Sequence, residues 1–206
     1  MAITNGYCTL QEIRGWTGVA DTSHTADDTR LEESVEAASR YIDDLCGRRF
    51  YVNSVDETRY YTASDPERLT SLDGLDDVVS ITTLKTDEDE DRTYEVSWAA
   101  TDYDLAPYNA ILDGKPYTRI DVAPDGRYEF PTHAKGVQIV GKFGWSAAPD
   151  VVKRACLILA AFLFKQKDVP LGVQASSGTG QIYIDPRISR MIEQMLRGVR
   201  KSPLEA

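Results

Sequence analysis

The sequence has few of the residues that build metal and disulfide sites. Its three cysteines are Cys8, Cys46 and Cys156, and its two histidines are His24 and His133, all far apart in the chain. Structural zinc sites use closely spaced pairs of such residues, and disulfide-linked domains use a denser and even set of cysteines. We therefore expect no metal site, no bound cofactor and a reducing compartment.

Long apolar segments are also absent. The longest uninterrupted apolar run, residues 155–164, has ten residues, whereas a helix needs about 20 to cross a bilayer. Residues 1–8 have neither the basic region nor the apolar core of a secretory signal. The sequence therefore predicts no membrane association.

Charge is unevenly distributed along the chain. The chain carries a net charge of −10, and residues 56–104 hold 15 acidic and 4 basic side chains. Residues 186–206 instead hold 5 basic and 2 acidic ones. Specific DNA-binding domains normally present a basic face, and an acidic surface repels phosphate. The acidic region is therefore not expected to bind nucleic acid tightly.

Helical patterns flank the chain's middle. In residues 27–47 apolar side chains recur every three or four positions, with Thr25 as the expected cap and Gly47 as the stop. Residues 149–167, with Pro149 in the first turn, are apolar all round at their centre, which indicates a buried helix. A capping box begins a short helix at Thr9, and Asp185 and Pro186 begin a last one.

The segment between the long helices has the composition of β-strands. Stretches rich in β-branched and aromatic residues predict strands at 59–62, 79–84, 94–98, 119–122 and 137–140. Asp-Gly pairs at 73–74, 113–114 and 125–126 indicate turns. Without intervening helices the sheet should be antiparallel.

These patterns predict an α+β protein: a helical bundle with an inserted antiparallel β subdomain and a C-terminal helical arm. The expected helical core comprises residues 1–50 and 144–171, and the β subdomain residues 51–143. Residues 172–180 are rich in Gly and Ser, so residues 172–206 are interpreted as a flexible linker and a docking helix.

Catalytic and ligand motifs are incomplete. Ser146 lies between a strand and a helix, as in a nucleophile elbow, but both histidines precede it, whereas that fold needs a later one. Residues 87–91 resemble half of a calcium loop, but Arg92 replaces the required Gly and Trp98 the ligating Glu. A solvated hairpin tip is favoured there over a loose cation site. Residues 178–180 lack the third glycine of a nucleotide loop.

The helical parts resemble the head–tail connector (adaptor, or head-completion) family of long-tailed bacteriophages. The resemblance covers about half of the chain, and the short members of the family lack the β region. The residues that carry it are Tyr7-Cys8-Thr9-Leu10, Asp28, Leu31, Ala37-Ala38-Ser39, Ile42-Asp43, Cys46-Gly47-Arg48-Arg49-Phe50, Gly141, Phe143-Gly144-Trp145, Pro149, Val152 and Ala155. Arg48 and Arg49 are expected to form caps and ion pairs rather than phosphate contacts.

The resemblance implies a non-enzymatic virion protein at the head–tail interface, assembled in the bacterial cytoplasm. Such adaptors form rings, commonly of twelve copies, between the portal protein and the next tail-side connector, a stopper or tail terminator. DNA passes through the channel without sequence-specific binding. The alternative is a small enzyme or accessory ligand-binding domain that uses a carboxylate-rich β surface.

Two sets of residues are the predicted interaction sites. The first, on the last helix, would dock on the portal or a neighbouring subunit, or fold back onto the chain's own core; it comprises Ile188, Met191, Ile192, Met195, Leu196, Arg187, Arg190 and Arg197. The second is an acidic loop facing the DNA channel or the tail; it comprises Asp87, Glu88, Asp89, Glu90 and Asp91.

Overall fold

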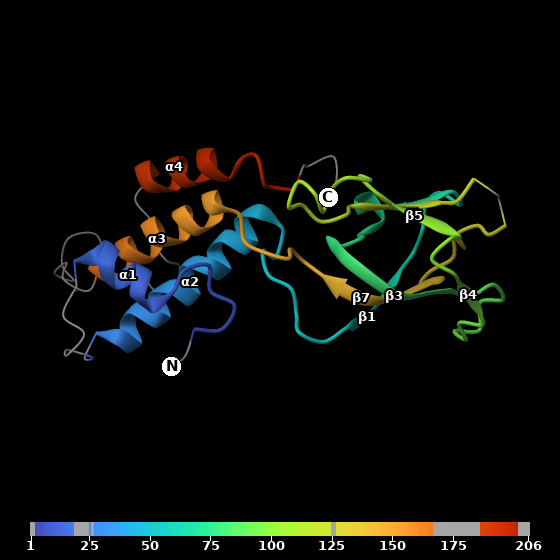
Figure 1. Cartoon of the computed structure of the whole chain (residues 1–206), viewed down its shortest axis with the longest axis horizontal. Helices are drawn as coiled ribbons and strands as arrows, with labels where there is room; N and C mark the ends of the chain where they lie inside the picture. The colour runs from blue at the N-terminus through green and yellow to red at the C-terminus, as the bar shows by residue number, and fades with distance from the viewer. Residues whose placement is uncertain (1–2, 19–24, 26, 125–126, 167–185, 202–206) are drawn as a thin grey trace. The chain divides into compact units, whose positions relative to one another are not determined.

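The computed structural model describes residues 3–18, 25, 27–124, 127–166 and 186–201 (Figure 1). The chain divides into two compact units. The helical unit comprises residues 1–47 and 148–200, and the β unit comprises residues 48–147 and 201–206. The predicted α+β fold is confirmed, with helices and antiparallel sheets segregated along the chain. The three-part domain division, with a separate arm from residue 172, stays a prediction.

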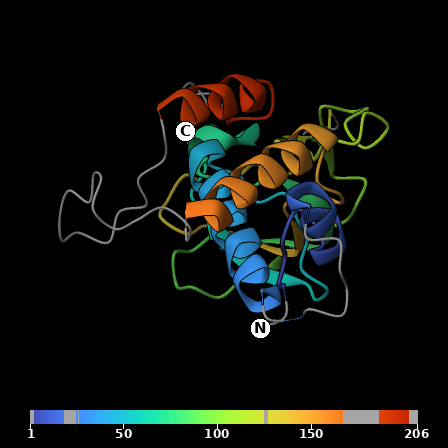
Figure 2. The same cartoon turned by 90° about the vertical axis from the view of Figure 1, so that its left-hand side faces the viewer.

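The helical unit is built around α3 (Asp150–Lys165), which contacts α1 (Leu10–Thr17), α2 (Asp28–Cys46) and α4 (Pro186–Leu196) (Figure 2). Contacts on several sides explain why the middle of α3 is apolar all round. Its buried side chains include Val152, Cys156, Leu159 and Phe164. The predicted packing of the two long helices is confirmed, because α2 lies against α3. No helix among the described residues is long and apolar enough to cross a membrane.

The ends of these helices largely follow the sequence signals. Thr9 and Glu12 form the predicted capping box of α1, in which the Thr9 N–H donates to Glu12 Oε2 at 2.7 Å. Gly47 ends α2 in the left-handed conformation, with φ of 63°. Two cap assignments were wrong. Residue 27, an Asp, caps α2 in place of Thr25, and Pro149 is the N-cap of α3 rather than a first-turn residue.

The segment before α1 is held on the long helices by polar contacts. The Tyr7 N–H donates to Ser39 Oγ at 3.1 Å, and Ser39 Oγ donates to the Val35 carbonyl at 2.7 Å. Beside them the thiols of Cys8 and Cys156 lie 3.5 Å apart, and both residues are buried. The residues Tyr7, Cys8 and Ser39 of the connector-like pattern therefore attach the N-terminal segment to α2 and α3.

The β unit contains two small antiparallel sheets. One has the strand order β1-β7-β3-β4, and the other β2-β6-β5. Side chains from both sheets, among them Leu69, Leu84, Ile120 and Ile139, form one buried cluster. The strands are β1 (Glu57–Tyr61), β2 (Arg68–Thr70), β3 (Val78–Thr86), β4 (Val96–Trp98), β5 (Tyr103–Ala106), β6 (Arg119–Val122) and β7 (Val137–Phe143), with a 3-10 turn, η1 (Ser71–Asp73), after β2.

Strand β7 runs between β1 and β3, and its alternate residues are buried. A Cβ at Gly141 would lie 2.2 Å from the Ser80 carbonyl oxygen. The register of β3 against β7 shifts on both sides of this position, which marks an irregular, bulged pairing. Gly141 is therefore required because the backbone of β3 approaches it too closely for any side chain.

Five predicted strands are present, with changed bounds at four of them. The segment predicted at 94–98 becomes a strand at Val96, and the strand predicted at 137–140 continues to Phe143. Strands β2 and β5 were missed. The Asp-Gly turns at 73–74 and 113–114 are present, with Gly74 and Gly114 at positive φ. The turn at 125–126, the linker at 172–180 and the cap at Asp185 lie outside the described residues.

Candidate interaction surfaces

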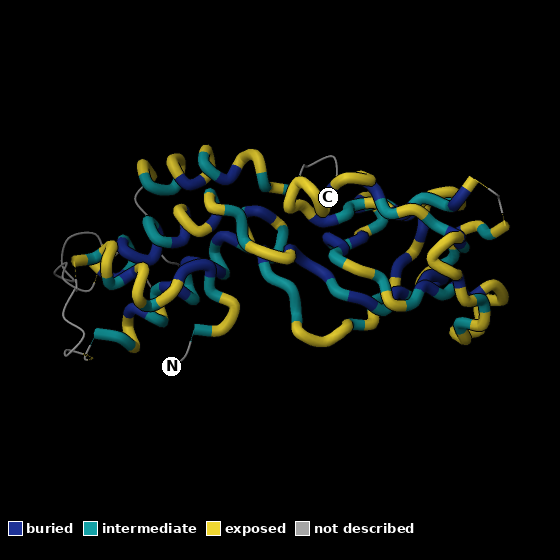
Figure 3. Tube along the Cα trace, viewed as in Figure 1, coloured by how far each residue is buried: buried dark blue, intermediate teal, exposed yellow. Residues whose placement is uncertain are grey.

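Helix α4 has one buried face and one exposed face (Figure 3). Ile192 and Leu196 are almost fully buried and α4 contacts α3. Met191 at the side of the helix remains 39% exposed. The structure thus matches the alternative interpretation, in which the last helix folds back onto the chain's own core. Its docking on a partner stays a prediction.

The exposed face of α4 is basic. Arg190 and Arg197 are exposed and lie seven residues apart, which places them on one side of a helix, opposite Ile192 and Leu196. Glu193 lies between them and accepts a hydrogen bond from Ser189 Oγ at 3.2 Å. The residues predicted as one site are therefore divided. Ile192 and Leu196 are buried while α4 stays on α3, and the exposed arginines and the partly exposed Met191 remain available to a partner.

The acidic segment connects β3 to β4, so it is the tip of a hairpin as predicted. Glu88, Asp89, Glu90 and Asp91 are exposed. Asp87 is not, and its assignment to a solvated tip was wrong: its side chain is fully buried. Its carboxylate accepts hydrogen bonds from the N–H groups of Glu90 at 2.9 Å and Arg92 at 3.0 Å.

These hydrogen bonds account for an unusual loop backbone. Glu90 and Arg92 have φ of 67° and 73°, a left-handed conformation that residues other than glycine rarely adopt. Arg92 stands where a calcium loop has glycine, and it takes a left-handed backbone there. Its guanidinium donates to the Ala134 carbonyl, which ties it to a neighbouring loop. The buried Asp87 carboxylate therefore holds the four exposed acidic residues in a defined loop.

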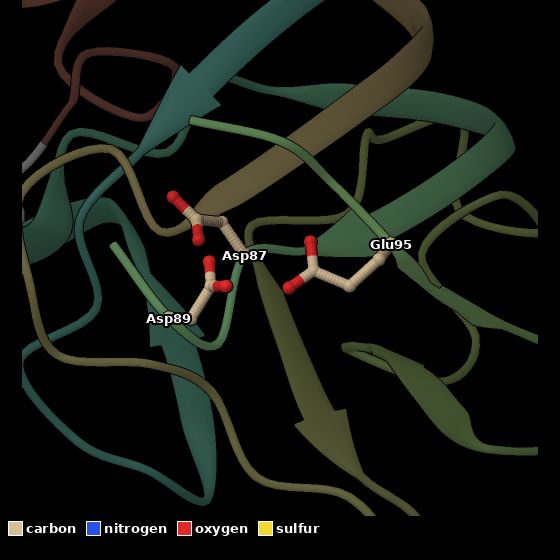
Figure 4. A group of neighbouring side chains, drawn as sticks. All are labelled: Asp87, Asp89 and Glu95. Carbon is tan, nitrogen blue, oxygen red and sulfur yellow. The ribbon is translucent and has the colours of Figure 1, made fainter. Parts of the chain in front are cut away.

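Three carboxylates converge at the base of this loop (Figure 4). One oxygen each from Asp87, Asp89 and Glu95 lies within 4.8 Å of the other two. Oxygen ligands of this kind suit a hard cation such as Ca²⁺. Both Asp87 oxygens, however, already accept backbone hydrogen bonds, and His133 Nε2 lies 3.6 Å from one of them. The contacts of Asp87 are thus explained by the loop itself.

The charges of this cluster shift two pKa values in opposite directions. Burial raises the pKa of Asp87, but the N–H groups of Arg92 and Glu90 stabilise its ionised form and the net pKa lies below its usual range. Desolvation and then the charge of Asp91 raise the pKa of Asp89. The loop is therefore anchored by a carboxylate that stays ionised, and its outer carboxylates repel one another.

The connector-like residues around Arg48 and Trp145 form a buried polar contact in the β unit. Asp77 accepts hydrogen bonds from the Arg48 guanidinium and, at 2.9 Å, from Trp145 Nε1. The Trp145 ring packs on Phe50, with centroids 5.2 Å apart. Burial raises the pKa of Asp77, which Arg48 and Trp145 oppose. Arg48 and Arg49 form ion pairs with Asp77 and Glu57, as predicted.

The described residues supply little for catalysis. Ser146 is exposed between β7 and α3, while the ring of His133 faces Asp87 in the acidic loop. A cavity of about 380 Å³ lies over β2 and β6, lined in part by Arg68, Arg119 and Asp121. Arg119 pairs with Asp121 across 2.8 Å, and Arg68 pairs with a neighbouring carboxylate. The cavity wall thus carries paired charges.

Comparison with known proteins identifies related folds but no family. No protein family profile matches the chain, and no curated protein sequence is similar to it. One structurally similar chain comes from the neck of an empty gene transfer agent (GTA) particle, computed with C6 symmetry. It has a TM-score of 0.56 and 18% sequence identity, over 95% of this chain and 92% of that chain. Another comes from the virion of a native GTA particle, with a TM-score of 0.54, 17% identity and the same coverage.

These matches show a shared fold along nearly the whole chain. A match that omitted the β unit, which has about half of the residues, could not cover 95% of the sequence. The β unit, which the short members of the connector family lack, is therefore part of the architecture shared with the GTA neck chain.

Proposed function

We propose that the protein is a structural adaptor of the neck of a phage-like particle, and that it assembles as a ring between the portal and the tail. The observation that carries this proposal is the likeness to a GTA neck chain over both units. The connector-like residues add support because the structure gives them packing roles: Tyr7 and Ser39 in the helical unit, and Arg48, Gly144 and Trp145 in the β unit.

The symmetry of the GTA neck suggests the size of the ring. That structure was computed with C6 symmetry. A ring of twelve copies contains sixfold rotation, so the dodecamer implied by the connector resemblance is compatible with it, as is a hexamer. We therefore propose a ring whose number of subunits is a multiple of six, with the portal on one side and a stopper or tail terminator on the other.

The charge of the protein suits a channel through which DNA moves. The net charge of −10 and the 15 acidic residues between 56 and 104 deny DNA the counterion release that drives phosphate binding. A ring of such subunits would repel the duplex and leave it free to slide. We propose no enzymatic role and no bound cofactor for the adaptor.

Deletion of the gene tests this function directly. We expect cells lacking the protein to make DNA-filled heads and separate tails but no joined particles, as seen by negative-stain electron microscopy. Purified protein added to the isolated heads should restore joining and appear as a ring beneath the portal. Normal, infectious or gene-transferring particles from the deletion strain would refute the proposal.

A further inference from the structure

The exposed face of α4 is a concentrated positive surface on an acidic protein. Arg190 on α4 and Arg197 directly after it are exposed, whereas Ile192 and Leu196 of the same helix are buried and α4 contacts α3. Residues 186–201 carry five basic side chains and one acidic one, in a chain with a net charge of −10. Because of this net charge, two copies of the protein repel each other on average. The approach of one copy to another is favoured where the basic residues of one meet carboxylates of the other. We refer to Arg190 and Arg197 as the basic face.

Among the residues that the structure describes, the β3–β4 hairpin has the densest exposed carboxylates. Residues 88–91 are four consecutive exposed acidic side chains, here termed the acidic loop. The loop backbone is held by the buried Asp87 carboxylate through the N–H groups of Glu90 and Arg92. The Arg92 guanidinium donates to the Ala134 carbonyl, which ties the end of the loop to a neighbouring loop. The acidic loop is thus organised before any partner arrives, which lowers the cost of binding.

Arg190 lies on α4 and Arg197 directly follows its last residue, so a helix rise of about 10 Å, at ~1.5 Å per residue, separates them. The acidic loop carries four consecutive exposed carboxylates, so it offers each arginine a partner of its own.

We infer that the basic face of α4 docks on the acidic loop of a second copy of this chain. This inference rests on the proposed function, because two unlike surfaces joined head to tail generate a ring. It places the acidic loop at a subunit interface instead of on the channel wall. Contacts between exposed charges contribute mainly orientation and association rate, so the pair sets which face of each neighbour is used, and assembly weakens with salt.

Charge reversal on each side tests the contact. The first variant is Arg190→Glu with Arg197→Glu, and the second is Glu88→Lys with Asp91→Lys. Each should lower the fraction of full-length protein found in rings on isolated portals at least tenfold, measured by negative-stain microscopy and sedimentation. A control with Arg30→Glu and Lys115→Glu makes the same charge change as the first variant at two exposed positions elsewhere. It should assemble like the wild type.

Mixing the two variants gives the decisive result. In an equimolar mixture the reversed face of the first variant meets the reversed loop of the second, and the unchanged basic face of the second meets the unchanged acidic loop of the first. Every contact between unlike variants is then attractive, so rings with an even number of alternating subunits should return to within about twofold of the wild type. Failure of the mixture to recover would overturn the inference, and so would normal assembly of either variant alone. Loss of binding to a DNA duplex by the first variant, without recovery in the mixture, would instead assign the basic face to DNA.

The wild-type protein separates this inference from the function on which it rests. Wild-type rings that both variants also form would overturn the inference alone. Absence of wild-type rings on portals would overturn the proposed adaptor function and the inference with it. Folding of each variant is checked by its far-ultraviolet circular dichroism.

Discussion

Replacing Gly144 by alanine should strongly destabilise the β unit. Gly144 follows β7 with φ of 108°, a backbone conformation that L-residues rarely adopt. A Cβ on it would lie 2.0 Å from the Tyr51 carbonyl oxygen. The backbone has little freedom to move away, because the Gly144 N–H donates to the Asp77 carbonyl at 2.8 Å and the Trp145 N–H to Tyr51 at 3.4 Å.

The magnitude combines two costs. Holding a residue with a side chain in a sparsely populated backbone region costs about 1–3 kcal/mol. Forcing an added methyl group into a packed site costs about 1–3 kcal/mol more. The free energy of unfolding should therefore fall by about 2–6 kcal/mol, a large part of the ~5–15 kcal/mol that stabilises a typical domain.

Urea unfolding followed by tryptophan fluorescence and circular dichroism measures this loss. Gly15→Ala is the matched control, because Gly15 is exposed inside α1 and an added Cβ there would have no heavy atom within 4 Å. That variant should be more stable by about 0.5–1 kcal/mol, since alanine is the better helix former. A Gly144→Ala protein within about 0.5 kcal/mol of the wild type, the range of neutral surface changes, would refute the steric argument.

Four further variants test other contacts. Asp77→Ala should lower the free energy of unfolding by about 3–5 kcal/mol because it leaves the Arg48 charge buried without its carboxylate. Trp145→Phe removes one hydrogen bond and should lower the free energy of unfolding by about 1 kcal/mol. Urea unfolding measures both losses. The hydrogen bond from the Thr9 N–H lowers the pKa of Glu12 in the folded protein. The ionised Glu12 therefore stabilises the fold above its ordinary pKa of ~4.3, and this stabilisation is lost as the pH falls through the lower folded-state pKa. Glu12→Gln should remove this acid dependence in unfolding measured from pH 7 to 3. Ile192→Ala should lower the free energy of unfolding by about 2–5 kcal/mol, and thermal unfolding measures this loss.

The helices were predictable because their signals are local. The apolar spacing of Leu31, Val35, Ala38 and Ile42 defines the buried face of α2 from sequence alone, and all four are fully buried. Strands β2 (Arg-Leu-Thr) and β5 (Tyr-Asp-Leu-Ala) were missed because each has only one β-branched or aromatic residue, whereas the equally short β4 and β6 have two. They are stabilised by pairing with β6, whose residues follow their partners in the chain by 13 or more positions. Such pairing is invisible in the local sequence.

The acidic loop shows the same limit at a candidate site. The run of acidic residues was evident, but the burial of Asp87 was not, because its partners are backbone N–H groups at Glu90 and Arg92 in left-handed conformations. The side chains that converge on it, His133 and Glu95, stand 46 and 8 residues away. The sequence thus located the acidic loop, and the fold decided which of its carboxylates is structural.

The position of α4 separates two roles for the C-terminal segment. For the apolar face to dock on a partner, α4 would have to leave α3 and expose Ile192 and Leu196, at a cost of about 1.5–3 kcal/mol for each side chain. If α4 stays on α3, Ile192→Ala destabilises the free protein, Met191→Ala at an exposed position has little effect, and assembly depends on Arg190 and Arg197. An Ile192→Ala protein that is as stable as the wild type but fails to join portals would show the reverse. In that case the apolar face is the docking surface, as the sequence analysis predicted, and α4 leaves α3 before assembly.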